Sequence, residues 1–305
     1  MPEIKKPCPK TGPRAGKGKR TTEDFPEGFY AMVSRIEDLY ILQSIRPVKV
    51  ILPFSRKIAK QLLNTELLKK ALFSKAGLPF HARDIILSLD PFFPQEKDSE
   101  FEEYIGALME KSYVNFIVNN LGHFSLFRRT DEAEKAVLIA GPWLYAFNSW
   151  AWEFITGAGA KYNVSPLENN RQNLERTFPM ENHSLRKRVF VTVFSRPALF
   201  RIRADLHKVY DFENFSGRKD ETFRLTPVDE GTNVYPWEPF SILDKTPFLR
   251  KAGFTRFILD FSSGPLKKAE YRDIMEAAQH ADLIPGASRF NWKNGFFHEP
   301  VLKQN

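Results

Sequence analysis

The sequence contains a single cysteine among its 305 residues, Cys8, close to the N-terminus. One cysteine cannot form a disulfide within the chain, and it cannot supply the several thiolates that an iron–sulfur cluster requires. We therefore expect no metal and no cofactor bound through cysteine. The lack of disulfides also favours a cytoplasmic location.

Long apolar runs are lacking as well. The basic N-terminus is not followed by the roughly 7–15 apolar residues of a secretory signal peptide. The longest apolar stretch, 136–147, is too short to cross a bilayer and is interrupted by Gly141 and Pro142. The sequence therefore predicts no membrane-spanning segment.

Familiar catalytic signatures are absent too. The six histidines never fall within five residues of one another, which excludes a zinc pair on one helix. No G-x-S-x-G turn occurs, residues 12–17 lack the P-loop spacing, and Gly157-Ala158-Gly159 lacks the third glycine of a dinucleotide-binding loop. The sequence shows no nucleophile–base pair, and we expect no cofactor.

The net charge of +8 is concentrated at one end of the chain. Residues 1–22 hold seven lysines and arginines against Glu3 alone, a net charge of +6, so the rest of the chain is nearly neutral. This segment is rich in proline and glycine and has no apolar face, so we expect residues 1–27 to be a disordered tail or linker. Its charge predicts weak, non-specific binding to nucleic acid.

Five short apolar runs end in a small or polar residue followed by a proline. These are Pro53, Pro91, Pro142, Pro166 and Pro197, and 144 residues separate the first from the last, an average spacing of 36. Proline cannot donate to a β-ladder and fits the first turn of a helix, so each run indicates a strand followed by a helix. The spacing is close to the roughly 31 residues per unit of an eight-fold βα barrel.

Eight apolar runs qualify as buried parallel strands: 31–34, 48–52, 84–89, 114–118, 136–140, 162–165, 188–194 and 256–261. Helical patterns fall between them at 36–45, 56–76, 99–111, 148–156, 167–177 and 267–281. Ser99 and Glu102 have the spacing of a capping box. The sequence thus predicts an α/β fold, a (β/α)8 TIM-type barrel over 28–285, with a C-terminal extension at 286–305.

One long interruption, 199–244, separates the seventh and eighth strands. Residues 221–225 and 233–235 flank Asp229-Glu230-Gly231, which predicts a hairpin, and a helix is expected at 241–251. An insertion after the seventh strand lies at the C-terminal mouth, where barrels keep their sites. We therefore expect a lid or a partner surface there.

Three consecutive segments resemble a known family. Residues 116–123 read FIVNNLGH, residues 141–149 read GPWLYAFNS and residues 164–169 read VSPLEN. In this order they resemble the strand ends of the collagenase-like peptidases of unknown catalytic type, the U-thirty-two peptidase family. The match extends through 191–199 and the 220–225 region to 253–257, and it covers roughly residues 30–262.

The resemblance implies a barrel with peptidase activity, or alternatively a non-catalytic subunit. Other family members resemble hydroxylation factors for RNA bases or quinones, which hold an iron–sulfur cluster on four cysteines. The corresponding run here, 197–203, has no cysteine, which argues against cluster chemistry in this chain. The basic start also resembles a linker between domains. The chain could therefore be one half of a longer protein, or the partner of a cluster-bearing homologous subunit or domain.

Candidate site residues follow the predicted strands at the mouth of the barrel. We predict Glu168, Asn148 and Arg196 as catalytic residues, and Asn119, Asn120, His123, Trp143 and Asp260 as substrate-binding residues. Each has a structural alternative. Asn148 could cap the N-terminus of a helix, and Glu168 could be stabilised by a helix dipole. Arg196 could form a salt bridge, and the residues at 119–123 could form a turn. Asp260 could face the barrel or cap the turn at 262–264.

Overall fold

The computed structural model describes residues 24–73, 77–92, 95–128, 133–179, 183–209, 214–216, 222–228 and 231–287. The predicted basic tail up to residue 23 and most of the predicted C-terminal extension lie outside these residues. Among the described helices, none has the length and apolar character needed to cross a membrane.

Parallel strands close into a barrel, as the sequence predicts. They are β1 (Gly28–Met32), β2 (Val50–Phe54), β3 (Ile85–Leu89), β4 (Asn115–Val118), β5 (Val137–Ala140), β6 (Ala160–Val164), β7 (Val189–Ser195) and β13 (Arg256–Asp260). Each strand pairs with the next, and the β6–β7, β7–β13 and β13–β1 pairings close the ring. The (β/α)8 prediction is confirmed, and each of its eight strand segments overlaps a strand of the barrel.

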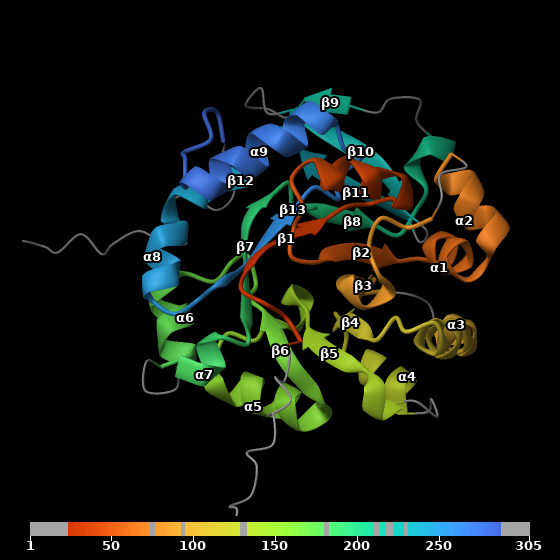
Figure 1. The fold of residues 1–305 in the computed structure, drawn as a ribbon, viewed down its shortest axis with the longest axis horizontal. Coiled ribbons are helices and arrows are strands. Elements are labelled where there is room, and N and C mark those ends of the chain that lie inside the picture. Colours follow the sequence, from red (N-terminus) through yellow and green to blue (C-terminus); the bar gives the residue numbers. More distant parts are fainter. Residues whose placement is uncertain are drawn as a thin grey trace, which may run out of the picture.

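Helices surround the ring of strands (Figure 1). They are α1 (Arg56–Leu63), α2 (Thr65–Ala71), α3 (Asp98–Glu110), α4 (His123–Arg128), α5 (Ser149–Ala158), α6 (Arg171–Thr177), α7 (His183–Arg186), α8 (Thr246–Lys251) and α9 (Lys268–His280). Short 3-10 turns join them: η1 (Ile36–Ser44), η2 (Ala82–Asp84), η3 (Gln95–Lys97), η4 (Ala133–Lys135), η5 (Pro142–Leu144), η7 (Leu206–Lys208) and η8 (Leu243–Lys245).

Two predicted helices are divided or shifted at asparagines. The predicted helix at 56–76 breaks at Asn64, whose Oδ1 accepts from the backbone N–H groups of Glu66 and Leu67 and so starts a second helix. The predicted helix at 167–177 begins only at Arg171, because Asn170 is its N-cap. Asparagine competes for helix N–H groups and therefore favours caps.

Two predicted helix ends are also wrong. Helix α3 already begins at Asp98, and its N-cap Lys97 makes no side-chain capping bond, so the predicted capping box does not form. Helix α5 continues past Gly157 to Ala158 and ends at Gly159, whose φ of 122° lies in the region that glycine adopts without strain.

The barrel interior is filled from its N-terminal end. Side chains from successive strands, including Tyr30, Ile51, Ile117 and Phe190, form an apolar cluster that Phe25 closes from below. Arg256 is fully buried beside it and donates through its guanidinium to the backbone oxygens of Phe25 and Lys187. Among the described residues, this end of the barrel is therefore filled by side chains.

A β-bulge in β7 changes which side chains face the interior. Ile258 of β13 pairs with Thr192, but Leu259 pairs with Phe194 and Asp260 pairs with Ser195, so Val193 is an extra residue. Val193 and Phe194 both pack in the outer core, between strands and helices. Without the bulge Ser195 would face outward; with it, Ser195 lies beside Asp260.

The insertion forms a second sheet of strand order β8-β11-β10-β9. The predicted hairpin is confirmed as β10 (Thr222–Val228) and β11 (Gly231–Pro236), while β8 (Phe200–Ile202) and β9 (Asn214–Ser216) add two unpredicted strands. The predicted helix at 241–251 is shorter, because β12 (Phe240–Ser241) pairs with β7 and a 3-10 turn precedes α8.

Candidate functional site

A cavity of about 500 Å³ lies at the C-terminal mouth of the barrel. Its floor is the last interior layer of the barrel, with Ile51, Ile117 and Ile258. Residues that follow the strands form its walls, and residues of the insertion sheet also line it. A cavity at this end of a parallel barrel is the usual place for a site.

Asp260 is the best-placed titratable group in this cavity. It ends β13, is partly buried and lines the cavity. Its Oδ2 accepts from Ser195 Oγ at 2.9 Å, and its Oδ1 accepts from the backbone N–H and the Oγ of Ser262 at 2.8 and 2.6 Å. Both predicted alternatives are therefore realised, since Asp260 faces the barrel mouth and caps the turn.

Burial raises the pKa of Asp260 above its ordinary value. The three hydrogen bonds from Ser195 and Ser262 act in the opposite direction, because they stabilise the ionised carboxylate, but the effect of burial is larger. A carboxyl group with a raised pKa in a cleft can hold and release a proton, which makes it a candidate for acid–base chemistry.

Ser195 holds Asp260 and is not itself reachable. It has no exposed surface, although it borders the cavity. A substrate carbonyl could not approach its Oγ, so we assign it to the positioning of the carboxylate. Ser195 could not be identified from the sequence, because the bulge that turns it inward depends on the pairing of β7 with β13.

Glu168 reaches the cavity from a turn. Residues 167–168 precede helix α6, which begins three residues later, so the dipole explanation for this glutamate is wrong. Glu168 is exposed and lines the mouth cavity. Tyr145 lines the same cavity, and its pKa is raised, first by burial and then by the charge of Glu168.

Arginines at the mouth are engaged with carboxylates. Arg196 forms an ion pair with Glu270 at 2.6 Å and donates from Nε to the backbone oxygen of Trp237. Arg201 of β8 pairs with Asp90 at 2.5 Å and so ties the insertion to the loop after β3. The salt-bridge alternative for Arg196 is therefore realised, although the residue also lines the cavity.

Asn119 lies at the mouth after β4 and is almost fully buried. Its Nδ2 donates to the backbone oxygen of Leu89 and to Ser88 Oγ, while its Oδ1 has no partner among the described residues. Gly141 leaves room for it, because a Cβ at that position would lie 1.8 Å from Asn119 Oδ1. Asn119 remains a candidate for binding substrate.

Two other predicted substrate-binding residues do not line the cavity. Asn120 is exposed and shapes its own turn, accepting from the Gly122 N–H and donating to Pro91. His123 is buried at the start of α4, where Nδ1 accepts from the Asn119 N–H. Burial lowers the pKa of His123 to about 4, so its ring is neutral at pH 7.

Asn148 also lies outside the cavity. Its Oδ1 accepts from the Ala151 N–H at 2.8 Å, which makes it the N-cap of α5. Of the three residues that we predicted to converge, the structure therefore brings Glu168 and Arg196 to the cavity and places Asn148 elsewhere.

Aromatic side chains form an exposed ledge at the rim. The ring of Trp143 meets Tyr145 edge-on, and Tyr145 stacks on Phe147 with ring centroids 5.9 Å apart. Trp143 and Tyr145 both line the cavity. Tyr145 is held at a φ of 49°, an unusual conformation for a residue other than glycine and one that recurs at functional sites.

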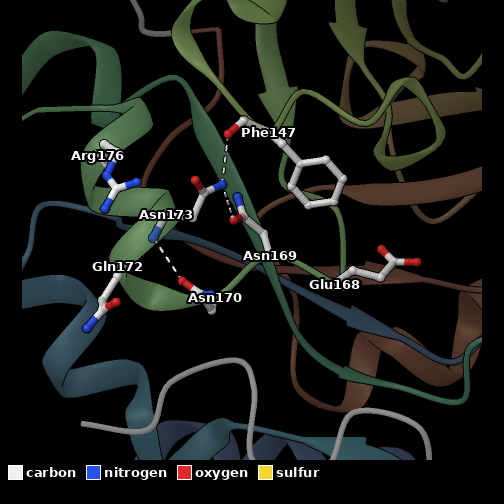
Figure 2. A pocket seen from close by; sticks show the side chains of 7 residues that line it. All are labelled: Phe147, Glu168, Asn169, Asn170, Gln172, Asn173 and Arg176. Atoms are coloured by element: carbon white, nitrogen blue, oxygen red, sulfur yellow. Dashed lines mark hydrogen bonds between the residues drawn. The ribbon is translucent and has the colours of Figure 1, made fainter. Parts of the chain in front are cut away.

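A second, smaller cavity of about 360 Å³ adjoins the turn before α6. Figure 2 shows Asn173 at its centre, donating from Nδ2 to the Phe147 backbone oxygen and to Asn169 Oδ1, both at 2.8 Å. Asn170 Oδ1 accepts from the Asn173 backbone N–H. These amides hold the turn, and Glu168 points away from them (Figure 2) and also lines the mouth cavity.

Within the described ranges, no three histidine, cysteine, aspartate or glutamate side chains gather as metal ligands. Cys8 lies outside these ranges, so the prediction that the whole chain binds no metal or cofactor stays a prediction.

Comparison with known proteins leaves the family open. No family model matches the chain, and no curated protein matches it significantly. Similar solved structures include the spore cortex-lytic enzyme SleL of Bacillus cereus, with 8% identity over 86% of this chain and 76% of that one, and a TM-score of 0.39. SleL of Bacillus megaterium QM B1551 gives 9% identity over 86% and 75%, with a TM-score of 0.29.

The C-terminal domain of a putative chitinase from Desulfitobacterium hafniense DCB-2 is 7% identical over 85% of this chain and 91% of that domain, with a TM-score of 0.28. These TM-scores are too low to bear on activity. The predicted membership of the U-thirty-two peptidase family therefore rests on the sequence segments alone.

Proposed function

We propose that the chain is a peptidase that hydrolyses peptide bonds at the mouth of the barrel, with Asp260 as general acid and Glu168 as general base. One observation carries the proposal: Asp260 has a raised pKa, is fixed by hydrogen bonds and lines a cavity of about 500 Å³. Acid–base catalysis needs a proton donor held in this way.

The hydrogen bonds of Asp260 leave one position on its carboxyl group free to carry a proton. Ser195 and Ser262 supply three donors to a carboxyl group that offers about four lone-pair positions. The remaining position can carry a proton and present it to a substrate. Its orientation is fixed, because two separate elements hold the two oxygens.

The two carboxyl groups would divide the proton transfers. Ionised Glu168 takes a proton from a water molecule as the water oxygen attacks the substrate carbonyl carbon. Protonated Asp260 gives its proton to the leaving nitrogen as the carbon–nitrogen bond breaks. The products are a carboxylic acid and an amine. Glu168 then releases the proton it gained to solvent and Asp260 takes one up from solvent, so water is the only molecule consumed. The surroundings of the two groups differ, because burial favours the protonated form of Asp260 whereas Glu168 is exposed.

Resemblance to the U-thirty-two peptidase family supports peptide as the substrate. The residues of this resemblance at 141–149 and 164–169 contribute Trp143, Tyr145 and Glu168 to the cavity. The single cysteine is consistent with a cytoplasmic peptidase.

Cleavage of a mixture of quenched fluorescent peptides, followed with the full chain, tests the proposal. We expect cleavage by the wild type, loss of at least a hundredfold in rate in Asp260→Asn, and an unchanged rate in Asp273→Asn, an exposed aspartate of α9. No cleavage by the wild type, or equal rates in wild type and Asp260→Asn, would overturn it.

A non-catalytic binding subunit is the second candidate. It is favoured by the ion pairs Arg196–Glu270 and Arg201–Asp90, which fix the shape of the mouth rather than leave free charges in it. Its partner would be a cluster-bearing homologous chain. Co-purification of such a chain, together with peptide binding without cleavage, would favour this candidate.

A further inference from the structure

Among the described residues, four basic side chains line the cavity at the barrel mouth: Arg35, Lys57, Arg196 and Arg201. Three of these form ion pairs with carboxylates, at 2.5 to 2.6 Å: Arg35 with Asp38, Arg196 with Glu270, and Arg201 with Asp90. The positive charges of the three arginines are therefore balanced within the protein.

Lys57 is the fourth, and its charge is not balanced in this way. It lies in the first turn of α1, directly after β2, and it is exposed. Its side chain has no hydrogen-bond or ion-pair partner in the part of the chain that the structure describes. A binding cavity usually holds a few charged groups that orient its ligand, and an accessible ammonium suits an anionic one.

Carboxylates from the same part of the mouth do not neutralise Lys57. Glu37 also lines the cavity, but its Oε2 is buried and has no partner among the described residues. Glu100 of α3 is held by Arg56 at 2.6 Å. The ammonium of Lys57 is therefore available to a ligand.

Lys57 and Glu168 lie on opposite sides of the mouth. Lys57 follows β2 and Glu168 follows β6, and these strands are four positions apart in either direction around the closed ring. Asp260 ends β13, which is two positions from β2 and two from β6. Asp260 therefore lies between the proposed general base and Lys57.

The register of the strands sets the separation of Asp260 and the segment that carries Lys57. Met32 of β1 pairs with Asp260 on one side and with Ile51 of β2 on the other. Neighbouring strands lie about 4.8 Å apart, so β13 and β2 are separated by roughly 10 Å at most. An extended chain advances about 3.4 Å per residue, so roughly two or three peptide residues span this separation.

The proposed hydrolysis gives the substrate a direction across the mouth. Glu168 activates the water that attacks the carbonyl carbon, and Asp260 protonates the leaving nitrogen. The leaving nitrogen begins the fragment that carries the C-terminus of the peptide. This fragment therefore lies on the Asp260 side, away from Glu168, which is also the side of Lys57.

We propose that Lys57 binds the C-terminal carboxylate of the substrate, so that the chain removes roughly two or three residues from the C-terminus of a peptide. This inference rests on the proposed peptidase function and adds which end of the peptide the site selects. Pro53 and Phe54 precede Lys57 and line the same cavity. Attraction between an ammonium and a carboxylate is stronger beside such an apolar wall than in water, because the local dielectric constant is lower.

Two pools of N-acetylated hexapeptides of randomised sequence test the inference. The pools are identical except that one ends in a carboxylate and the other in a carboxamide. The full chain is incubated with each pool at an ionic strength of about 0.15 M, and the products are identified by mass spectrometry. We expect the carboxylate pool to be cleaved about tenfold faster, mostly two or three residues from the C-terminus.

Variants of α1 assign the preference to one side chain. In Lys57→Gln, the rate for the carboxylate pool should fall to that of the carboxamide pool, and the carboxamide rate should not change. Lys57→Arg keeps a cation and should keep most of the preference. The matched control is Lys60→Gln, which removes the same charge from an exposed position of α1 outside the described lining of the cavity and should keep the full preference.

Binding is measured separately from cleavage. The full chain with Asp260→Asn is immobilised, and the retention of each pool is compared. We expect the carboxylate pool to be retained about tenfold more strongly, and Lys57→Gln in the same background should abolish the difference.

Cleavage of both pools at equal rates by the wild type would overturn the inference and leave the peptidase proposal standing. A preference that survives in Lys57→Gln, or that is lost equally in Lys60→Gln, would have the same consequence. No cleavage of either pool would overturn the peptidase proposal. Retention of the carboxylate pool that depends on Lys57 would then still support binding of a C-terminal carboxylate, whereas equal retention would overturn that as well.

Discussion

Ser195 Oγ donates to Asp260 Oδ2 at 2.9 Å, across two neighbouring strands of the barrel. The bond exists because a bulge at Val193 lets Ser195 face the cavity. Bulges next to active sites commonly re-aim a side chain in this way. The mouth of this barrel thus depends on an irregularity in one strand.

Replacing Ser195 by alanine removes a hydrogen bond that stabilises the ionised form of Asp260. The pKa of Asp260 should therefore rise further, and the rise should appear as a shift toward higher pH in the pH dependence of peptide cleavage. We expect a loss of about 1 kcal/mol in the free energy of unfolding. An unshifted pH profile would show that Ser195 does not act on Asp260.

Glu168→Gln tests the second carboxyl group. Glu168 lies in the turn before α6 and outside its first helical turn, so we expect the free energy of unfolding to change by less than about 0.5 kcal/mol. Peptide cleavage should fall tenfold or more, equivalent to about 1.4 kcal/mol. Glu153→Gln on the exposed side of α5 is the control. A tenfold loss in both variants, or in neither, would contradict the assignment of Glu168.

His123 should make the protein less stable in acid. Burial lowers the pKa of His123 in the folded chain to about 4, below the value of about 6.5 expected for an unfolded chain. Its contribution to stability is then complete above pH 6.5 and is lost as the pH falls through 4, by up to about 3 kcal/mol. Urea unfolding at pH 7 and pH 4.5 measures the difference, and His123→Asn should reduce it. An equally steep pH dependence in the variant would assign the effect to other groups.

The variant Asn148→Ala tests whether Asn148 caps helix α5 or takes part in catalysis. Loss of the hydrogen bond to the Ala151 N–H should lower the free energy of unfolding by about 1 kcal/mol. Peptide cleavage should stay within twofold of the wild type at a temperature where the variant is folded, and Asn148→Ser should restore the stability. A large loss of activity with unchanged stability would contradict this and show that Asn148 takes part in catalysis.

Much of the fold could be predicted from the sequence because strands buried on both faces read as apolar runs ended by proline. The hairpin at β10 and β11 was visible through its turn residues. The breaks at Asn64 and Asn170 were missed, although asparagine before a helical pattern is a recognised start signal.

The site was less predictable, for a physical reason. Strand ends indicate which residues reach the mouth, so Glu168, Arg196 and Asp260 could be named. Whether Ser195 faces inward depends on how β7 pairs with β13, and no local pattern records that register. The placement of Arg201 and Asn233 beside the cavity depends likewise on a cross-strand pairing within the insertion.

The pKa of Asp260 is the most direct measurement of the central claim, that this carboxyl group delivers a proton at the mouth of the barrel. It can be followed by carbon NMR of the aspartate carboxyl groups in the full chain, with Asp260→Asn assigning the signal. The account predicts a pKa above the value of about 3.9 usual for an aspartate in water, and the same value in the pH dependence of cleavage. A pKa at or below about 3.9 would contradict it, because the site would then not favour the protonated form of Asp260.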